Sequence, residues 1–150
     1  MITFLKGDLL KDDAEVLVNT VNTVGVMGKG VALAFKNAFP HNYLTYRNAF
    51  AAKQLAIGKL LVVRDSNLLL GEKIIVNFPT KTHWRLPSEY TYIVQGLTAL
   101  RKYLIDNEVG SIGMPAPGCG NGGLDWGIIR PLIEELLADL ELDIRVYEPL

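Results

Sequence analysis

The sequence predicts an α/β sandwich with a mostly parallel central sheet. The first reason is that short apolar runs, typical of strands, alternate with longer stretches in which apolar residues recur at helical spacing. The second is that strand runs such as EKIIVNFPT are apolar along most of their length, as expected for buried strands. Strands that alternate with helices in this way are typical of a parallel sheet covered by helices.

The N-terminal half of the chain is predicted to contain four strands and two helices. Their ranges are 2–8 (strand), 14–22 (strand), 30–39 (helix), 42–52 (helix), 56–66 (strand) and 72–80 (strand). The stretch GVALAFKNAF places its apolar residues on roughly one face of a helix, which Pro40 ends because proline cannot continue it. Pro79 marks the end of the fourth strand.

The C-terminal half is predicted to contain two more strands, each preceded by a helix. Their ranges are 87–110 (helix), 111–118 (strand running into a loop), 124–140 (helix) and 143–149 (strand). Ser88 follows a proline and is expected to cap the first of these helices, and Gly110 ends it. Pro131 falls in the early turns of the last helix, where it is tolerated.

Composition limits the classes of function. With 150 residues, 49% hydrophobic and 21% charged, the chain is expected to form one globular domain. Its net charge is −1, so any nucleic-acid binding must rest on a local basic patch. The single cysteine, Cys119, rules out an internal disulfide and fits a reducing compartment. A signal peptide and an apolar run of about 18 residues are both lacking, so a cytoplasmic location without membrane contact is expected.

Two glycine-rich stretches each lead into a predicted helix. They are NTVGVMGKG, residues 22–30, and PAPGCGNGGLDW, residues 115–126. Glycine allows backbone N–H groups to approach an anion, and a helix N-terminus adds partial positive charge, so the pair suggests a diphosphate held between two loops. Alternatively, the glycines serve only the geometry of tight turns.

Known nucleotide motifs and metal sites do not fit these stretches. Gly30 stands where a phosphate-binding P-loop carries Ser or Thr, and Leu33 stands at the third glycine of the dinucleotide fingerprint. Neither nucleotide hydrolysis nor hydride transfer is therefore supported. His41 and His83 are far apart and Cys119 is alone, so no metal and no cofactor are expected.

Taken together, the motifs resemble those of the macrodomain family over essentially the whole chain. The segments that carry the resemblance are GDLL, VNTVN with MGKGVA, and PAPGCGNGGLDW. It implies a three-layer α/β/α sandwich with a mixed, mostly parallel sheet, and binding of ADP-ribose. The longer stretches NTVNTVGVMGKGVALAFK, NFPTKTHWRLPSEY and GCGNGGLDW resemble the DarG branch, antitoxins that remove ADP-ribose placed on DNA bases by the toxin DarT.

This resemblance implies an ADP-ribose site. Its expected members are Asp8, Leu9, Asn19, Asn22, Gly28, Lys29, Gly30, Val31, Pro117, Gly118, Cys119, Gly120, Asn121, Gly122, Gly123, Leu124 and Tyr147. Residues 28–31 and 118–124 would hold the diphosphate, and Asn22 would use both ends of its amide on the distal ribose.

Some of these residues also have simpler interpretations. Asp8 would accept from the adenine amino group, or form an Asx turn at a strand end. Asn19 would contact the ribose, or hold the loop. Lys29 would contact phosphate, or remain a solvated charge, and Tyr147 would flank the adenine or ribose, or belong to the core.

Catalysis is assigned to Lys81 and Asn22. Lys81 matches the catalytic lysine of macrodomains that remove ADP-ribose from protein glutamates. It would attack the anomeric carbon as a neutral amine, or assist departure of the base as a cation. Those relatives carry an aspartate where this chain has Gly122, which weakens a lysine-plus-aspartate mechanism and favours the DarG-like interpretation.

His83, Trp84 and Arg85 are predicted to contact DNA, because interleaved cations and aromatic rings suit base stacking and backbone binding. The simpler interpretation is an exposed loop with scattered charge.

Three functions follow from the sequence. The preferred one is release of ADP-ribose from single-stranded DNA, with a DarT-type toxin as partner. The others are release from protein carboxylates or small derivatives, and a reader that binds without turnover. Residues 1–150 are expected to form a single, monomeric macrodomain, standing alone or as the N-terminal part of a longer antitoxin.

Overall fold

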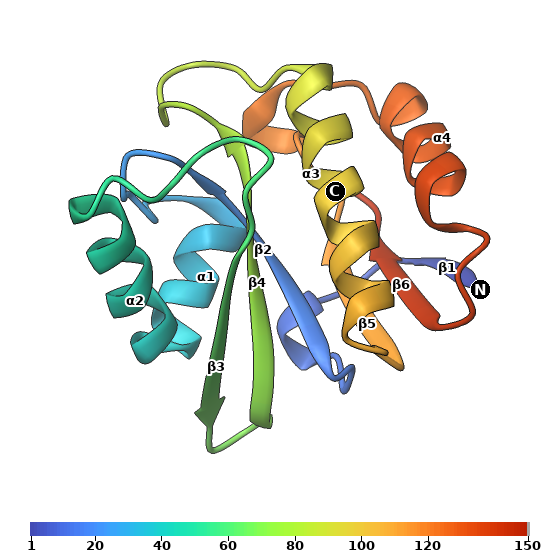
Figure 1. Ribbon diagram of the computed structural model, residues 1–150, viewed down its shortest axis with the longest axis horizontal. Helices are drawn as coiled ribbons and strands as arrows, with labels where there is room; N and C mark the ends of the chain where they lie inside the picture. Colours follow the sequence, from blue (N-terminus) through green and yellow to red (C-terminus); the bar gives the residue numbers. More distant parts are fainter. Residues whose placement is uncertain (150) are drawn as a thin grey trace.

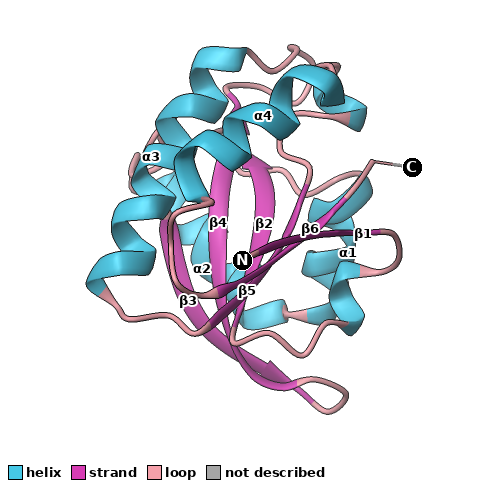
Figure 2. Cartoon of the chain, turned by 90° about the vertical axis from the view of Figure 1, so that its right-hand side faces the viewer, coloured by secondary structure: helices cyan, strands magenta, loops and turns pink. Residues whose placement is uncertain are grey.

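A computed structural model describes residues 1–149 and shows a six-stranded sheet between two layers of helices. The strands are β1 (Ile2–Leu5), β2 (Val16–Asn22), β3 (Leu61–Asn67), β4 (Gly71–Lys81), β5 (Ser111–Pro115) and β6 (Asp143–Tyr147). Their order across the sheet is β1-β6-β5-β2-β4-β3. All neighbours are parallel except β3 and β4, which form an antiparallel hairpin at one edge. Figure 2 shows the sheet running from β3 at one edge to β1 at the other.

Four α-helices and two short 3₁₀ helices complete the described fold. They are η1 (Leu9–Lys11), α1 (Gly30–Ala38), α2 (Pro40–Ala51), α3 (Tyr90–Asp106), η2 (Gly120–Gly122) and α4 (Trp126–Leu137). Helices α1 and α2 cover one face of the sheet and α3 and α4 the other (Figure 1). The predicted three-layer sandwich with a mixed, mostly parallel sheet is confirmed. Over residues 1–149, none of the helices is long and apolar enough to span a bilayer.

The central strands are buried on both faces because alternate side chains point to opposite helical layers. In β4, Val76 and Phe78 pack with Ile93 and Leu97 of α3. Ile75, which precedes Val76, belongs to a second cluster with Phe35 of α1. This two-sided burial fixes the register of β4 and therefore the position of the loop that follows it.

Most predicted boundaries differ from the structure by a few residues. For example, β1 ends at Leu5 and not at residue 8, β4 continues past Pro79 to Lys81, and α3 ends at Asp106 and not at Gly110. The strand expected from residue 56 begins at Leu61, because residues 56–59 form a turn in which Gly58 has φ +78°. Ser88 does not cap α3, whose N-cap is Glu89. Instead the backbone N–H of Ser88 donates to the carbonyl of Gly122 at 3.0 Å, so tertiary contact overrides the local capping preference.

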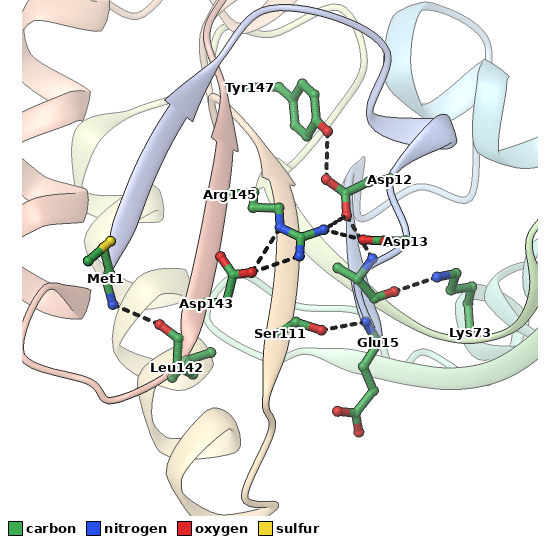
Figure 3. Close-up of polar contacts among 11 residues, drawn as sticks. Met1, Asp12, Asp13, Glu15, Lys73, Ser111, Leu142, Asp143, Arg145 and Tyr147 are labelled. Atoms are coloured by element: carbon green, nitrogen blue, oxygen red, sulfur yellow. Dashed lines mark hydrogen bonds and ion pairs between the residues drawn. The ribbon is translucent and has the colours of Figure 1, made fainter.

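A charged cluster fastens the last strand to the segment before β2 (Figure 3). Arg145 forms ion pairs with Asp12 at 2.8 Å, with Asp143 at 2.7 Å and with Asp13. The Tyr147 hydroxyl donates to the second carboxylate oxygen of Asp12 at 2.5 Å. Burial, followed by this hydrogen bond, raises the pKa of Tyr147 to about 12, so the hydroxyl stays protonated. The cluster therefore satisfies the carboxylate of Asp12, whose side chain is only 2% exposed.

We expect Arg145→Gln to destabilise the fold by about 2 kcal/mol, because it leaves the buried Asp12 carboxylate without its cation. Arg101→Gln is the control, since Arg101 pairs with the exposed Asp139 at the surface. Its effect should be much smaller. Urea unfolding of both variants measures the difference. Equal losses of stability would contradict the role given to the buried carboxylate.

Candidate active site

Asn22 and Lys81 meet where β2 and β4 end. The two strands are parallel neighbours, and a bulge after Val21 brings Asn22 into register with Lys81. The following loops are joined by hydrogen bonds from Thr23, whose N–H donates to the Lys81 carbonyl at 3.0 Å and whose hydroxyl donates to the Thr82 carbonyl at 2.8 Å. In open α/β sheets this carboxyl edge is where ligands bind. The structure therefore brings the two predicted catalytic residues side by side.

The two glycine-rich loops face each other beside this pair. A Cβ placed on Gly30 would lie 3.1 Å from Nδ2 of Asn121, so the start of α1 touches the loop between β5 and α4. That loop is also bonded to the segment after β4, through Ser88 and Gly122. The loops after β4 and β5 both lie at the top of Figure 1. Three loops that are far apart in sequence thus form one continuous site.

Both glycine-rich loops present exposed backbone to solvent. Gly28, Lys29 and Gly30 are exposed, and no side chain caps the N-terminus of α1. In the second loop Gly120 has φ +68° and no atom within 4 Å of the place where a Cβ would stand. Exposed amides at a helix N-terminus, opposite a loop with open space over its backbone, suit a diphosphate.

The rest of the second loop is held by its own packing. Pro117 and Gly118 are buried, and the carbonyl of Gly118 accepts from the N–H of Leu124 at 3.0 Å. Cys119 is half-buried, and burial, followed by the charge of Asp125, raises the pKa of its thiol to about 11. Asp125 caps α4 by accepting from the N–H of Gly127 at 2.8 Å. With its raised pKa, the Cys119 thiol is protonated at neutral pH.

The side chain of Asn22 forms most of its hydrogen bonds with the loop that follows it. Its Oδ1 accepts from the N–H groups of Val24 at 3.1 Å and Val26 at 3.3 Å, and from the Tyr46 hydroxyl at 2.9 Å. Its Nδ2 donates to the Val26 carbonyl at 2.7 Å. A side-chain amide has two N–H groups. The second N–H of Nδ2 is therefore the group left to face a ligand, and the acceptor end is occupied.

Asn19 lies beneath the site. It is fully buried, and its Nδ2 donates to Oδ1 of Asn77 at 3.1 Å. Asn77 in turn exchanges hydrogen bonds with Asn42 of α2, at 2.8 and 3.1 Å. Because a side chain with no accessible surface cannot contact a ligand, this geometry supports the alternative in which Asn19 holds the loop.

Lys81 is half-buried and close to a second lysine. Its Nζ lies 3.5 Å from the Trp84 carbonyl. Burial, and then the positive charge of Lys29, lower the pKa of Lys81. Lys81 therefore loses its proton more easily than an exposed lysine.

The segment after Lys81 exposes an aromatic side chain between two polar neighbours. Trp84 is 43% exposed. The Arg85 guanidinium lies 4.5 Å from its ring centroid, and the His83 ring lies 5.3 Å away at a tilt of 31°. Nδ1 of His83 accepts from the N–H of Arg85 at 3.0 Å, which fixes the turn. The three residues predicted to contact DNA thus form one stack next to Lys81.

The residues assigned to adenine lie on the other side, near β1 and β6. Asp8 is exposed, and its Oδ1 accepts from the N–H of Leu10 at 3.0 Å, which is the expected Asx turn. Leu9 is buried. The Tyr147 ring lies 3.9 Å from the place where a Cβ on Gly7 would stand. Asp8 and Tyr147 therefore flank the same turn.

Helix α2 supplies contacts that the motifs do not indicate. The hydroxyl of Tyr46 reaches Asn22, and Nη1 of Arg47 donates to the Gly25 carbonyl at 2.9 Å. The Phe50 ring packs so closely on Gly25 that a Cβ there would lie 2.8 Å from it. Nothing in the local sequence of α2 indicates these roles, because they depend on how the helix packs on the sheet. Among residues 1–149, no group of three or more His, Cys, Asp or Glu side chains is arranged so that it could hold a metal ion.

This fold and site define a macrodomain, and the chain belongs to the Macro domain family, whose model matches residues 18–133. The chain is similar to two curated DNA ADP-ribosyl glycohydrolases. It is 49% identical over 150 residues to that of Thermus aquaticus, covering 99% of this chain and 41% of the relative. It is 45% identical to that of Mycobacterium tuberculosis, covering 99% and 42%. The chain thus spans about two fifths of the length of these relatives.

Solved structures agree with this relationship. The macrodomain of Mycobacterium tuberculosis DarG superposes with a TM-score of 0.95 at 44% identity, covering 100% of this chain and 99% of that one. Thermosipho africanus DarTG in complex with ADP-ribose superposes with a TM-score of 0.92 at 36% identity, covering 99% of this chain and 42% of that one. Membership of the macrodomain family and similarity to DarG, both predicted from the motifs, are confirmed.

Proposed function

We propose that this chain binds ADP-ribose and hydrolyses the bond between ADP-ribose and a base of single-stranded DNA. One observation carries the proposal. The Asn22–Lys81 pair lies between facing glycine-rich loops and an exposed His83–Trp84–Arg85 stack. The loops suit a diphosphate, the pair suits the bond to be cut, and the stack suits the nucleic acid beyond it. The similarity to DNA ADP-ribosyl glycohydrolases supports the same substrate.

The reaction breaks the bond between the anomeric carbon of the distal ribose and the base. The carbon gains a hydroxyl group from water and the base gains a proton. Lys81, with its lowered pKa, attacks the carbon as an amine and displaces the base, and water then cleaves the bond between Lys81 and the carbon; alternatively, it stabilises the departing base as a cation while water attacks the carbon directly. Asn22 donates its free N–H to a ribose oxygen. A base inside a duplex would be hidden from this edge of the sheet, so single-stranded DNA is the expected substrate.

The test is incubation with an ADP-ribosylated single-stranded oligonucleotide and, in parallel, with glutamate-ADP-ribosylated protein. Release from the oligonucleotide supports the proposal. Release only from the protein would move the substrate to protein carboxylates. Calorimetry that detects binding of ADP-ribose without either release would make the chain a reader.

A DarT-type toxin is the proposed source of the modification and a proposed partner. A relative from Thermosipho africanus is named a fusion of DNA ADP-ribosyl transferase and DNA ADP-ribosyl glycohydrolase, and is 37% identical over 163 aligned residues, covering 99% of this chain and 42% of the relative. Direct contact with such a toxin, a monomeric state and a cytoplasmic location remain predictions from the sequence.

Trp84→Ala should reduce release of ADP-ribose from the oligonucleotide by about tenfold while leaving the affinity for free ADP-ribose unchanged. Loss of base stacking costs about 1–3 kcal/mol per base. Leu86→Ala is the control, because Leu86 is an exposed apolar side chain of the same loop. If Trp84→Ala and Leu86→Ala reduced release equally, the specific role proposed for the His83–Trp84–Arg85 stack would be contradicted.

The pH dependence of release should report Lys81. Lys29→Gln removes the positive charge that helps lower the pKa of Lys81, so the midpoint assigned to Lys81 should move to higher pH. If the rate of release increases as the pH rises through the midpoint, Lys81 acts as an amine nucleophile. If the rate decreases, the cationic form of Lys81 is required. Lys36→Gln, in the last turn of α1, is the control. A midpoint that does not move in Lys29→Gln would contradict the coupling.

A further inference from the structure

Tyr46 is a fully buried polar group next to the proposed active site. It lies on α2, on the face that packs against the end of β2. Its hydroxyl contacts two atoms of one residue, the carbonyl oxygen of Asn22 at 2.7 Å and Oδ1 of Asn22 at 2.9 Å. Burial raises the pKa of Tyr46 well above its ordinary value, so the hydroxyl is a permanent donor.

These contacts determine the orientation of the Asn22 side-chain amide, that is, the positions of Oδ1 and Nδ2. Oδ1 faces two loop N–H groups and the Tyr46 hydroxyl, whose single proton is shared between Oδ1 and the Asn22 carbonyl. Reversal of the amide would place N–H groups against the two backbone donors and would take Oδ1 away from the Tyr46 hydroxyl. Nδ2 is thereby kept on the opposite side, bonded to Val26 with its second N–H free. The site thus presents a donor, not an acceptor, to the distal ribose.

The helix that carries Tyr46 is itself tightly anchored. One turn earlier Asn42 is buried in the amide network with Asn77, and its backbone N–H donates to Asp65 at 2.8 Å. One residue after Tyr46, Arg47 donates to the loop carbonyl of Gly25. These contacts therefore fix the position of the Tyr46 hydroxyl relative to the end of β2.

We propose that Tyr46 is the positioning residue that orients Asn22 for donation to the distal ribose. This inference rests on the proposed function. Tyr46 touches no substrate, and it acts through Asn22 by fixing the orientation of the side-chain amide and the carbonyl beside it.

Tyr46→Phe tests the proposal because it removes only the hydroxyl. We expect kcat for release from the ADP-ribosylated oligonucleotide to fall about tenfold or more, with the affinity for free ADP-ribose within about threefold of wild type. Tyr43→Phe is the matched control, a half-buried tyrosine of the same helix with no hydrogen bond to Asn22. The assay is run well below the melting temperature of each variant.

A double-mutant cycle separates positioning from general stability. If Tyr46 acts through Asn22, Tyr46→Phe should change kcat in the wild-type background and have no further effect in Asn22→Ala. Additive effects, or a Tyr46→Phe enzyme within twofold of wild type, would overturn the inference while leaving the proposed function intact.

A second measurement does not depend on turnover. The side-chain amide of Asn22 should give a single, slowly exchanging pair of NMR signals in the wild type, and a faster-exchanging pair in Tyr46→Phe. Unchanged signals would overturn the inference. Wild-type protein that releases no ADP-ribose from the oligonucleotide would instead defeat the proposed function, and the NMR result would still decide the role of Tyr46.

Discussion

Lys81→Ala is expected to lose release of ADP-ribose from DNA by about 10²–10⁴-fold, while binding free ADP-ribose as the wild type does. Lys81 lies at the end of β4 beside Asn22, at the carboxyl edge where the bond to be cut would lie. The facing loops that suit the diphosphate do not include Lys81. Its removal should therefore act on the reacting centre and spare the binding of the ligand.

Lys81→Arg separates the two roles open to the lysine. Arginine keeps the positive charge but cannot lose its proton, so it can support a departing base and cannot act as an amine nucleophile. Retention of a substantial part of the rate in Lys81→Arg would indicate the cationic role, and a loss equal to that of Lys81→Ala the nucleophilic one. Full activity in Lys81→Ala, by single-turnover release from the oligonucleotide, would remove Lys81 from the mechanism.

The sheet and its helical layers could be predicted because local patterns and tertiary structure agree over most of the chain. The apolar run of β4 is buried on both faces, as its composition indicates. The start of β3 could not be predicted, since the apolar Leu60 packs against the core although it lies before the strand, just after the turn at Gly58. Apolar character predicts burial, but it does not distinguish a strand from a turn that packs on one.

The candidate site also contains some residues that could be predicted from the sequence and others that could not. Asn22, Lys81 and the glycine-rich loops follow strand ends, so parallel topology alone brings them together. The capping role expected for Ser88 failed because its N–H is used by Gly122, across the site. Tyr46 carries no local signal at all. Its role depends on the packing of α2 against β2, which no short motif encodes.

Gly120→Glu is expected to weaken ADP-ribose binding by about 100-fold or more. The space over Gly120 is open, so a glutamate side chain would enter it without displacing protein atoms and would repel the diphosphate. Gly30→Glu should act similarly from the facing loop, with some additional disturbance because Asn121 lies close by.

Gly71→Glu supplies the control for backbone strain. Gly71 has φ +72°, close to the +68° of Gly120, and likewise has no atom within 4 Å of a Cβ. It begins β4, at the end of the strand opposite Lys81, so its substitution adds the same charge and strain far from the site. Both variants should lose a similar, small amount of stability, about 1–2 kcal/mol, for placing a side chain in the left-handed region. Calorimetry with ADP-ribose should then show normal binding for Gly71→Glu and none at micromolar concentration for Gly120→Glu. Normal binding by Gly120→Glu would mean that the diphosphate does not lie over this loop.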